Sequence, residues 1–150
     1  MNMEKTFIRV RSIKDIAIFS SLALTGIILT ILPIGDAAKL AGFFIIFAAV
    51  ILAFVLKSGY KDVETNEKYS KKDKYFQQAM HAAISSAIAS KPDSIDLAEE
   101  NKGNAVKLDI YYSKTTGKAY LQLFEYVPYT YQPCSKMYEH EISNVANLIK

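Results

Sequence analysis

Few residues in this chain could carry out covalent chemistry. The single cysteine is Cys134, and His140, one of two histidines, follows six positions later. A thiol at the start of a helix and an imidazole are the groups of a nucleophile–base pair. Residues six positions apart on a helix do not share one face, so this pair does not meet without a bend. We therefore expect no catalytic cysteine and no enzymatic activity.

Metal and phosphate sites are not indicated either. Glu139, His140 and Glu141 are potential metal ligands, but neighbouring helical residues point apart and lack the i, i+4 spacing of helical zinc sites. Residues 113–118 (Ser-Lys-Thr-Thr-Gly-Lys) contain the residue types of a phosphate-binding loop without its order. We expect no metal and no cofactor.

Nucleic acid is an unsuitable partner for the polar part of the chain. Residues 57–150 contain 13 lysines, no arginine and 12 acidic residues. A nucleic-acid-binding domain is usually strongly basic, and arginine is the residue expected at phosphate and base contacts.

Aromatic residues are the best candidates for a binding surface. All ten tyrosines fall between Tyr60 and Tyr138, and tyrosine is favoured at protein interfaces because it offers a large ring and one polar group. The candidate protein-binding residues are Tyr111, Tyr112, Tyr120, Phe124, Tyr126, Tyr129 and Tyr131. Two other interpretations stay open: these rings fill both sides of a thin sheet, or some rest against lipid headgroups.

The elements that would position these rings can be read from residue spacing. Apolar residues recur at helical spacing from Tyr75 to about Ala89, which predicts a helix ending before Lys91-Pro92. Alternation over residues 105–112 and 119–127 predicts a β-hairpin, and Ser135 is placed to cap a last helix through about Ile149. Residues 75–150 are thus expected to form a small α+β domain of helix, β-hairpin and helix, after a charged connector over residues 58–74.

Two uncharged apolar runs precede this domain. Residues 16–35 include 20 positions without charge and residues 40–56 include 17. At about 1.5 Å per helical residue they rise roughly 30 and 25 Å, against a hydrocarbon core of about 30 Å. We expect a transmembrane helical hairpin over residues 15–57. A cleaved secretory signal is disfavoured, because the first run exceeds the usual length of a signal core and a second run follows at once.

Small residues at helical spacing suggest how these helices pack. They are Ala17, Ser21, Gly26, Ala38, Gly42, Ala49 and Ala53. Close approach of backbones at small residues is the main packing device of helices in lipid. The spacing leaves open whether the two helices pack on each other or on another copy of the chain.

Charges flanking the runs indicate the orientation. Four basic residues precede the first run within residues 1–14, six lysines lie within residues 57–74, and only Lys39 lies in the turn. Cytoplasmic flanks are enriched in lysine and arginine, so both termini should be cytoplasmic, with residues 1–14 as a cytoplasmic or interfacial segment. The small size and simple plan favour a multi-pass protein of a bacterial inner membrane.

Together these features predict a small integral membrane protein that presents a cytoplasmic protein-binding module, as an accessory or assembly subunit of a membrane complex. Its expected partners are the lipid bilayer and either a second copy of itself or another membrane protein. The alternative is an oligomeric pore or membrane-perturbing effector gated by the cytoplasmic domain, with Ser20, Ser21, Thr25 and Thr30 lining the channel.

Overall fold

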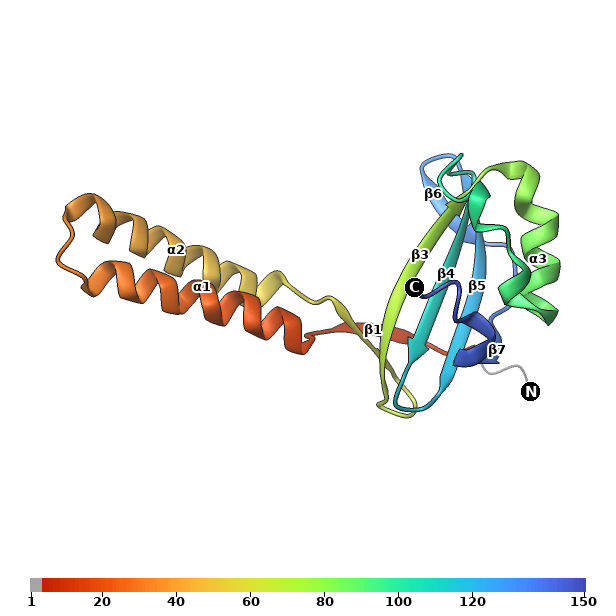
Figure 1. Ribbon diagram of the computed structural model, residues 1–150, viewed down its shortest axis with the longest axis horizontal. Coiled ribbons are helices and arrows are strands. Elements are labelled where there is room, and N and C mark those ends of the chain that lie inside the picture. Colours follow the sequence, from red (N-terminus) through yellow and green to blue (C-terminus); the bar gives the residue numbers. More distant parts are fainter. Residues whose placement is uncertain (1–3) are drawn as a thin grey trace. The chain divides into compact units, whose positions relative to one another are not determined.

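The computed structural model describes residues 4–150, which divide into two compact units. The hairpin unit is residues 8–60, and the sheet unit is residues 4–7 together with 61–150. In chain order the elements are β1 (Phe7–Val10), α1 (Ile13–Ile31), α2 (Asp36–Val55), β2 (Gly59–Asp62), β3 (Lys68–Phe76), α3 (His81–Ser90), β4 (Val106–Ser113), β5 (Lys118–Val127), β6 (Thr130–Pro133) and β7 (Tyr138–Glu141), with short 3-10 turns between several of them (Figure 1).

The two ends of the hairpin unit are joined at a buried carboxylate. Ser12 and Asp15 form a capping box at the start of α1, in which each side chain accepts a hydrogen bond from the other residue's backbone N–H. Asp15 also accepts hydrogen bonds from the backbone N–H of Ser58, at 2.8 Å, and from its hydroxyl, at 2.6 Å. Asp15 thereby connects the start of α1 to the chain that leaves α2.

The helices α1 and α2 approach most closely at two glycines. A Cβ atom on Gly42 would lie 2.6 Å from the carbonyl oxygen of Gly26 and 2.5 Å from Oγ1 of Thr30. Gly26, Gly42 and Ala49 are buried in this contact, and Ala38 and Ala53 are half-buried. Within the hairpin unit these small residues therefore serve packing of α1 on α2. Ala17 and Ser21 are exposed and lie outside this contact.

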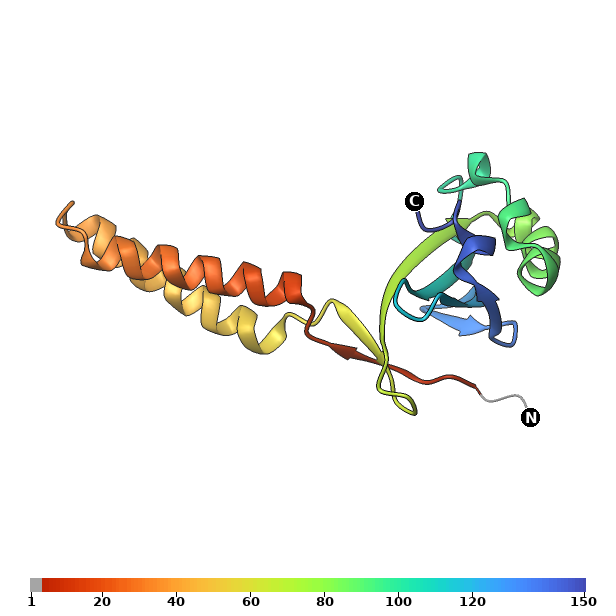
Figure 2. The ribbon, with the colours of Figure 1, turned by 60° about the horizontal axis from the view of Figure 1, so that its bottom comes forward.

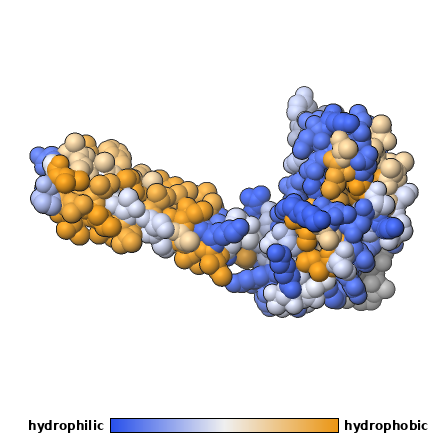
Figure 3. Space-filling model, in the orientation of Figure 1, coloured by the Kyte–Doolittle hydropathy of each residue, from blue (hydrophilic) through white to orange (hydrophobic). Residues whose placement is uncertain are grey.

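The outer surface of the hairpin unit is apolar. Both helices are long and apolar enough to cross a membrane, and only 11% of the most apolar window of each is buried. The core helix of a soluble protein is mostly buried, whereas Phe43, Phe44, Phe47 and Phe54 of α2 are 60–73% exposed. Apolar residues cover most of the visible surface of this unit (Figure 3). Such a surface suits lipid, so the two helices could span a bilayer.

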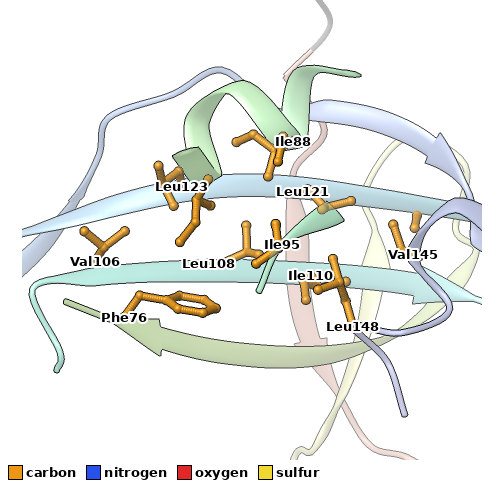
Figure 4. Packing of buried hydrophobic residues seen from close by; sticks show 13 residues of the cluster. Phe76, Ile88, Ile95, Val106, Leu108, Ile110, Leu121, Leu123, Val145 and Leu148 are labelled. Carbon is orange, nitrogen blue, oxygen red and sulfur yellow. The ribbon is translucent and has the colours of Figure 1, made fainter. Parts of the chain in front are cut away.

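The sheet unit is built on antiparallel pairing. The strand order is β1-β2-β3-β4-β5-β6, and β7 also pairs with β5. Phe124–Val127 of β5 pair with β6, while Lys118–Leu121 pair with β7. α3 lies against one face of the sheet (Figure 2). The hydrophobic core fills the space between them (Figure 4) and includes Phe76, Ile84, Ile88, Ile95, Val106, Leu108, Ile110, Leu121, Leu123, Val145 and Leu148.

This architecture corrects the expected helix–hairpin–helix plan, because the unit is mostly sheet. The two expected strands are present as β4 and β5, but the helix expected from Tyr75 begins only at His81. Tyr75 and Phe76 end β3 instead, where Phe76 pairs with Val106 and is completely buried. The pairing satisfies the backbone and places the Phe76 ring in the core at the same time.

The helix expected after Ser135 is also wrong. Tyr138–Glu141 form β7, and a 3-10 turn, Ile142–Val145, follows. β7 occupies the part of the β5 edge that β6 leaves unpaired, which satisfies backbone groups that a helix would not reach. Residues 58–74, expected as a connector, contain β2 and most of β3. β1 lies within the expected N-terminal segment 1–14, of which residues 1–3 are outside the described part.

A second buried carboxylate, Asp62, ties the N-terminal residues into the sheet unit. It accepts hydrogen bonds from Lys5 Nζ at 2.6 Å, Thr65 Oγ1 at 2.8 Å and the backbone N–H of Glu64 at 3.1 Å. Burial by itself raises the pKa of Asp62, but these donors outweigh it and hold the pKa below 3.8.

The stability contribution of Asp62 should therefore depend on pH. Asp62→Asn is expected to lower the free energy of unfolding by about 2 kcal/mol at neutral pH, because a charge-assisted hydrogen bond is lost. The pKa of the folded state lies below the ordinary value of 3.8, so this stabilisation is present above pH 3.8 and disappears as the pH falls through the folded-state value. Urea denaturation at several pH values should show the two proteins converging in acid. Glu64→Gln, at a side chain that is 52% exposed, is the control, and a pH-independent difference would contradict this role.

Candidate functional site

The face of the sheet opposite α3 carries most of the aromatic residues. Along each strand, alternate residues point to opposite faces, and the aromatic residues on this face come from β3, β4, β5 and β6, together with Phe7 of β1. They form two groups, which we name the inner aromatic cluster (Phe7, Tyr69, Tyr111 and Tyr120) and the tyrosine end (Tyr75, Phe124, Tyr126 and Tyr131). We include Tyr129 of the adjoining β5–β6 turn in the tyrosine end.

The inner aromatic cluster is a packed structure. The Phe7 ring stacks on Tyr111 with 4.1 Å between ring centroids and meets the edge of Tyr69 at 5.0 Å. Tyr69 and Tyr120 are each only 4% exposed, and burial raises the pKa of both phenols. The Tyr120 hydroxyl donates a hydrogen bond to Glu139 Oε2. Tyr120, an expected binding residue, thus has almost no ring area left for a partner, and Phe7 covers much of Tyr111.

A row of charges separates the two aromatic groups. The carboxylate of Asp109 lies 3.0 Å from Lys71 Nζ and 3.1 Å from Lys107 Nζ. Burial raises the pKa of Asp109 despite these two ammonium groups. Lys107 Nζ also lies over the rings of Phe124, at 4.9 Å, and Tyr131, at 5.3 Å. The row therefore fixes ring positions in the tyrosine end through cation–π contacts.

The tyrosine end contains the exposed rings. Tyr126 and Tyr131 are cross-strand partners with centroids 5.2 Å apart, and Tyr75 lies 6.0 Å from Tyr131. Tyr126 is 50% exposed. The Tyr131 hydroxyl donates a hydrogen bond to the carbonyl oxygen of Asn104 at 2.7 Å, and burial raises its pKa. The rings are thus held in defined positions and still present area to a partner.

Beside these rings lies a groove of about 540 Å³, which we name the tyrosine groove. Its lining residues are Tyr75, Asn101, Lys102, Gly103, Asn104 and Tyr131. The backbone N–H of Asn101 donates to the carbonyl oxygen of Tyr75 at 2.8 Å, which anchors this loop on β3. A Cβ on Gly103 would lie 2.9 Å from Cα of Gln77, so only glycine lets the loop approach this closely.

The turn between β5 and β6 presents a tyrosine in an unusual conformation. Val127 pairs with Thr130, so Pro128 and Tyr129 form a two-residue turn. Tyr129 has a φ of +73° and is 96% exposed. Proline followed by a residue with positive φ is the pattern of a type II turn, in which glycine or asparagine normally occupies the second position. A bulky side chain there is strained.

Sequence reasoning missed Tyr75, because it assigned this residue to a helix. The signal was present in β3, where Tyr69, Lys71, Asp73 and Tyr75 alternate with residues of the other face. Tyr112, another expected binding residue, is half-buried and packs against the hydrophobic core.

Cys134 and His140 lie at different positions along β5, because the backbone N–H of Cys134 donates to the carbonyl oxygen of Leu123 whereas His140 pairs with Ala119. Cys134 does not begin a helix, and burial raises the pKa of its thiol, opposite to the activation expected at a helix start. His140 Nε2 contacts the carbonyl oxygen of Ile88 at 2.6 Å and so joins β7 to α3. Among residues 4–150 there is no group of three or more His, Cys, Asp or Glu side chains placed to hold a metal ion.

Comparison of the chain with protein family models, with curated proteins and with solved structures gives no match.

Proposed function

We propose that this chain is a small membrane-anchored protein whose sheet unit binds a protein partner through the tyrosine end, as an accessory or assembly subunit of a membrane complex. The observation that supports this most directly is the contrast in exposure between tyrosines. Tyr69 and Tyr120 are buried in the inner aromatic cluster, whereas Tyr126 and Tyr129 are 50% and 96% exposed at one end of the sheet. Exposed aromatic rings beside a groove are typical anchors of protein interfaces.

The proposed location follows from the two apolar helices and the charges around them. α1 and α2 would cross the bilayer as a hairpin, and the basic residues on both flanks favour cytoplasmic termini. We propose the inner membrane of a bacterium as the site, with the sheet unit on the cytoplasmic side. The near-neutral sheet unit suits a protein partner better than a nucleic acid.

The mechanism would be binding at raised local concentration. Tethering the sheet unit to the bilayer raises its effective concentration toward a partner in the same membrane. The hydrogen bond from Tyr131 to Asn104 and the Lys107 contacts hold the rings before a partner arrives, which lowers the entropy lost on binding. The groove offers phenols, amides and one ammonium group. These groups serve recognition, so the proposed role is non-enzymatic and needs no cofactor.

An oligomeric pore is the alternative, and exposure of Ser20, Ser21 and Thr25 on α1 favours it. Two of the expected hydroxyls are already used within α1, however. Thr25 Oγ1 donates to the carbonyl oxygen of Ser21, and Thr30 Oγ1 donates to that of Gly26. Only the hydroxyls of Ser20 and Ser21 are then left in a lining that is otherwise mostly apolar, which supports the binding role over the pore. Release of a trapped dye from vesicles containing the purified chain would reverse this preference.

The proposal can be tested by affinity purification of the full chain in mild detergent. Replacing both Tyr126 and Tyr129 by Ala should reduce the amount of co-purified partner at least tenfold, because each exposed anchor contributes more than about 1 kcal/mol to binding. The matched control replaces Lys114 and Thr115, exposed residues of the β4–β5 turn, by Ala. Unchanged capture by the tyrosine variant would refute the assignment of the site, provided both variants insert into membranes equally.

A further inference from the structure

The turn and the groove of the sheet unit complement each other chemically, but the Tyr129 ring is 96% exposed and does not line the groove of its own chain. We infer that the tyrosine groove of one copy takes the Pro128-Tyr129 turn of a second copy of this protein. The inference rests on the proposed function and names the partner of its site.

The Pro128-Tyr129 turn presents an exposed ring in a fixed conformation, which suits it to enter a groove. Tyr129 holds a φ of +73° at a position that favours glycine, and its ring is 96% exposed. Strained conformations of this kind cost about 1–3 kcal/mol and cluster at ligand clamps and other functional sites. Pro128 and the flanking pair Val127–Thr130 fix the turn, so the ring is presented with little freedom to lose on binding.

The groove offers the complementary chemistry. The rings of Tyr75 and Tyr131 line it, and edge-to-face or offset contacts with a third ring are favourable. Asn101 and Asn104 supply amide groups, and Lys102, whose side chain is 53% exposed, supplies a donor for a phenol oxygen or a turn carbonyl. The groove, of about 540 Å³, is open to solvent, so a protruding turn can enter it from outside.

The charges of the turn and of the groove are also compatible with each other. Residues 127–130 (Val-Pro-Tyr-Thr) carry no charged side chain, so burying the turn does not incur the desolvation penalty of a charged group. Of the six described residues that line the groove, Lys102 alone is charged, and it pairs with Glu99 at 2.7 Å. Because Glu99 neutralises the charge of Lys102, the groove favours an uncharged ligand over a strongly acidic or basic one.

The position of the two parts allows a symmetric exchange. The backbone N–H of Tyr126 donates to the carbonyl oxygen of Ala105, and the Tyr131 hydroxyl donates to that of Asn104. The groove loop and the turn therefore lie at the same end of the sheet. A twofold axis at this end brings the turn of each copy to the groove of the other, and both contacts form at once.

The dimer would be weak without the membrane. Each tyrosine buries roughly 150–250 Å², so two exchanged turns make a small interface of the transient class. Two copies anchored in one bilayer with the same orientation meet at raised effective concentration. The contact should therefore be strong in vesicles and much weaker for diluted chains in detergent.

Photo-crosslinking of the full chain tests the inference. A p-benzoylphenylalanine residue in place of Tyr129 keeps a ring on the turn, and the same residue in place of Lys114 is the matched control at the β4–β5 turn. Each variant is mixed with an isotopically labelled, otherwise unaltered copy in phosphatidylethanolamine–phosphatidylglycerol vesicles. Illumination should join label-free to labelled chains only for the Tyr129 position, with the adduct mapped to Tyr75, Tyr131 or residues 101–104. Absence of a dimer adduct, or an adduct mapped elsewhere, overturns the inference.

A second variant separates the ring from the fold of the turn. Tyr129→Gly keeps the positive φ at no steric cost, so the sheet should retain its stability, while the unlabelled dimer fraction measured by chemical crosslinking should fall at least fivefold. An unchanged dimer fraction overturns the inference. If no self-contact forms but capture of another protein still requires Tyr126 and Tyr129, the proposed function stands and the inference fails. If the adduct forms and no other protein is captured, the inference stands by itself.

Discussion

Gly42→Leu is expected to lower the free energy of unfolding of the helical hairpin by about 3 kcal/mol, at the upper end of the usual cost of overpacking. A single Cβ at this position would already lie 2.6 Å from the Gly26 carbonyl oxygen and 2.5 Å from Thr30 Oγ1. Both neighbours belong to α1, and one is backbone, so the conflict is relieved only by moving the helices apart. That movement also separates other residues of the contact, such as Ala49.

The measurement is reversible unfolding of the full chain in mild detergent titrated with a denaturing detergent, followed by circular dichroism. Ala41→Leu is the matched control, because Ala41 neighbours Gly42 on the same helix but is exposed. Its side chain would point to detergent or lipid, where leucine is as acceptable as alanine. Equal effects of the two substitutions would show that the close approach of Gly26 and Gly42 does not hold the hairpin together.

The parts of the fold that sequence predicted are those with a strong local pattern. The apolar runs correspond to α1 and α2, and alternation of Val106, Leu108 and Ile110 with Lys107 and Asp109 correctly predicts β4. α1 and α2 are recognised by a long run without charge, and β4 is recognised by apolar residues at every second position.

Where both faces of a strand carry polar residues, the pattern fails. β3 reads Lys-Tyr-Ser-Lys-Lys-Asp-Lys-Tyr-Phe, which resembles a solvated connector. Two of its lysines bind residues distant in the sequence instead: Lys74 binds Glu100 at 2.9 Å, and Lys71 binds Asp109 at 3.0 Å. Tyr75 and Phe76 then happen to continue the helical spacing of α3, and long-range pairing with β4 overrides that local preference.

In the candidate site, too, the sequence indicates what depends on local alternation and misses what depends on long-range contacts. Alternation places Tyr111 on the face of its strand opposite Val106, Leu108 and Ile110, and the register of the structure pairs it with Tyr120. It does not indicate that Phe7, more than a hundred residues before Tyr111, stacks on that ring. Exposure depends on such distant contacts, so the sequence identifies the tyrosines of the sheet but not which of them remain accessible. Only the strained turn at Tyr129 has a local sign, the preceding Pro128.

Asp109→Ala is the second substitution with a large expected effect, a loss of about 3 kcal/mol in the free energy of unfolding, as for other broken buried ion pairs. The side chain of Asp109 is 5% exposed, and those of Lys71 and Lys107 are 14% and 16% exposed. Without the carboxylate, two ammonium groups remain on a half-buried face with fewer partners. Asp73→Ala is the control, because Asp73 also pairs with Lys71 but is 34% exposed, and its loss should cost less than about 1 kcal/mol. Urea denaturation of the full chain in mild detergent measures both.

The cause of that loss can be isolated by removing the whole charged row. The penalty comes either from ammonium groups that Asp109 no longer neutralises or from the attraction that is lost. In the first case, Lys71→Met and Lys107→Met added to Asp109→Leu should recover most of the stability, since well-packed apolar groups often replace buried ion pairs at little cost. The Lys107 contacts with Phe124 and Tyr131 would be lost in this variant, so partner capture should weaken even where stability returns. Recovery of both stability and capture would show that the charged row has no part in holding the tyrosine end. Failure to recover stability would show that the row contributes net attraction to the sheet.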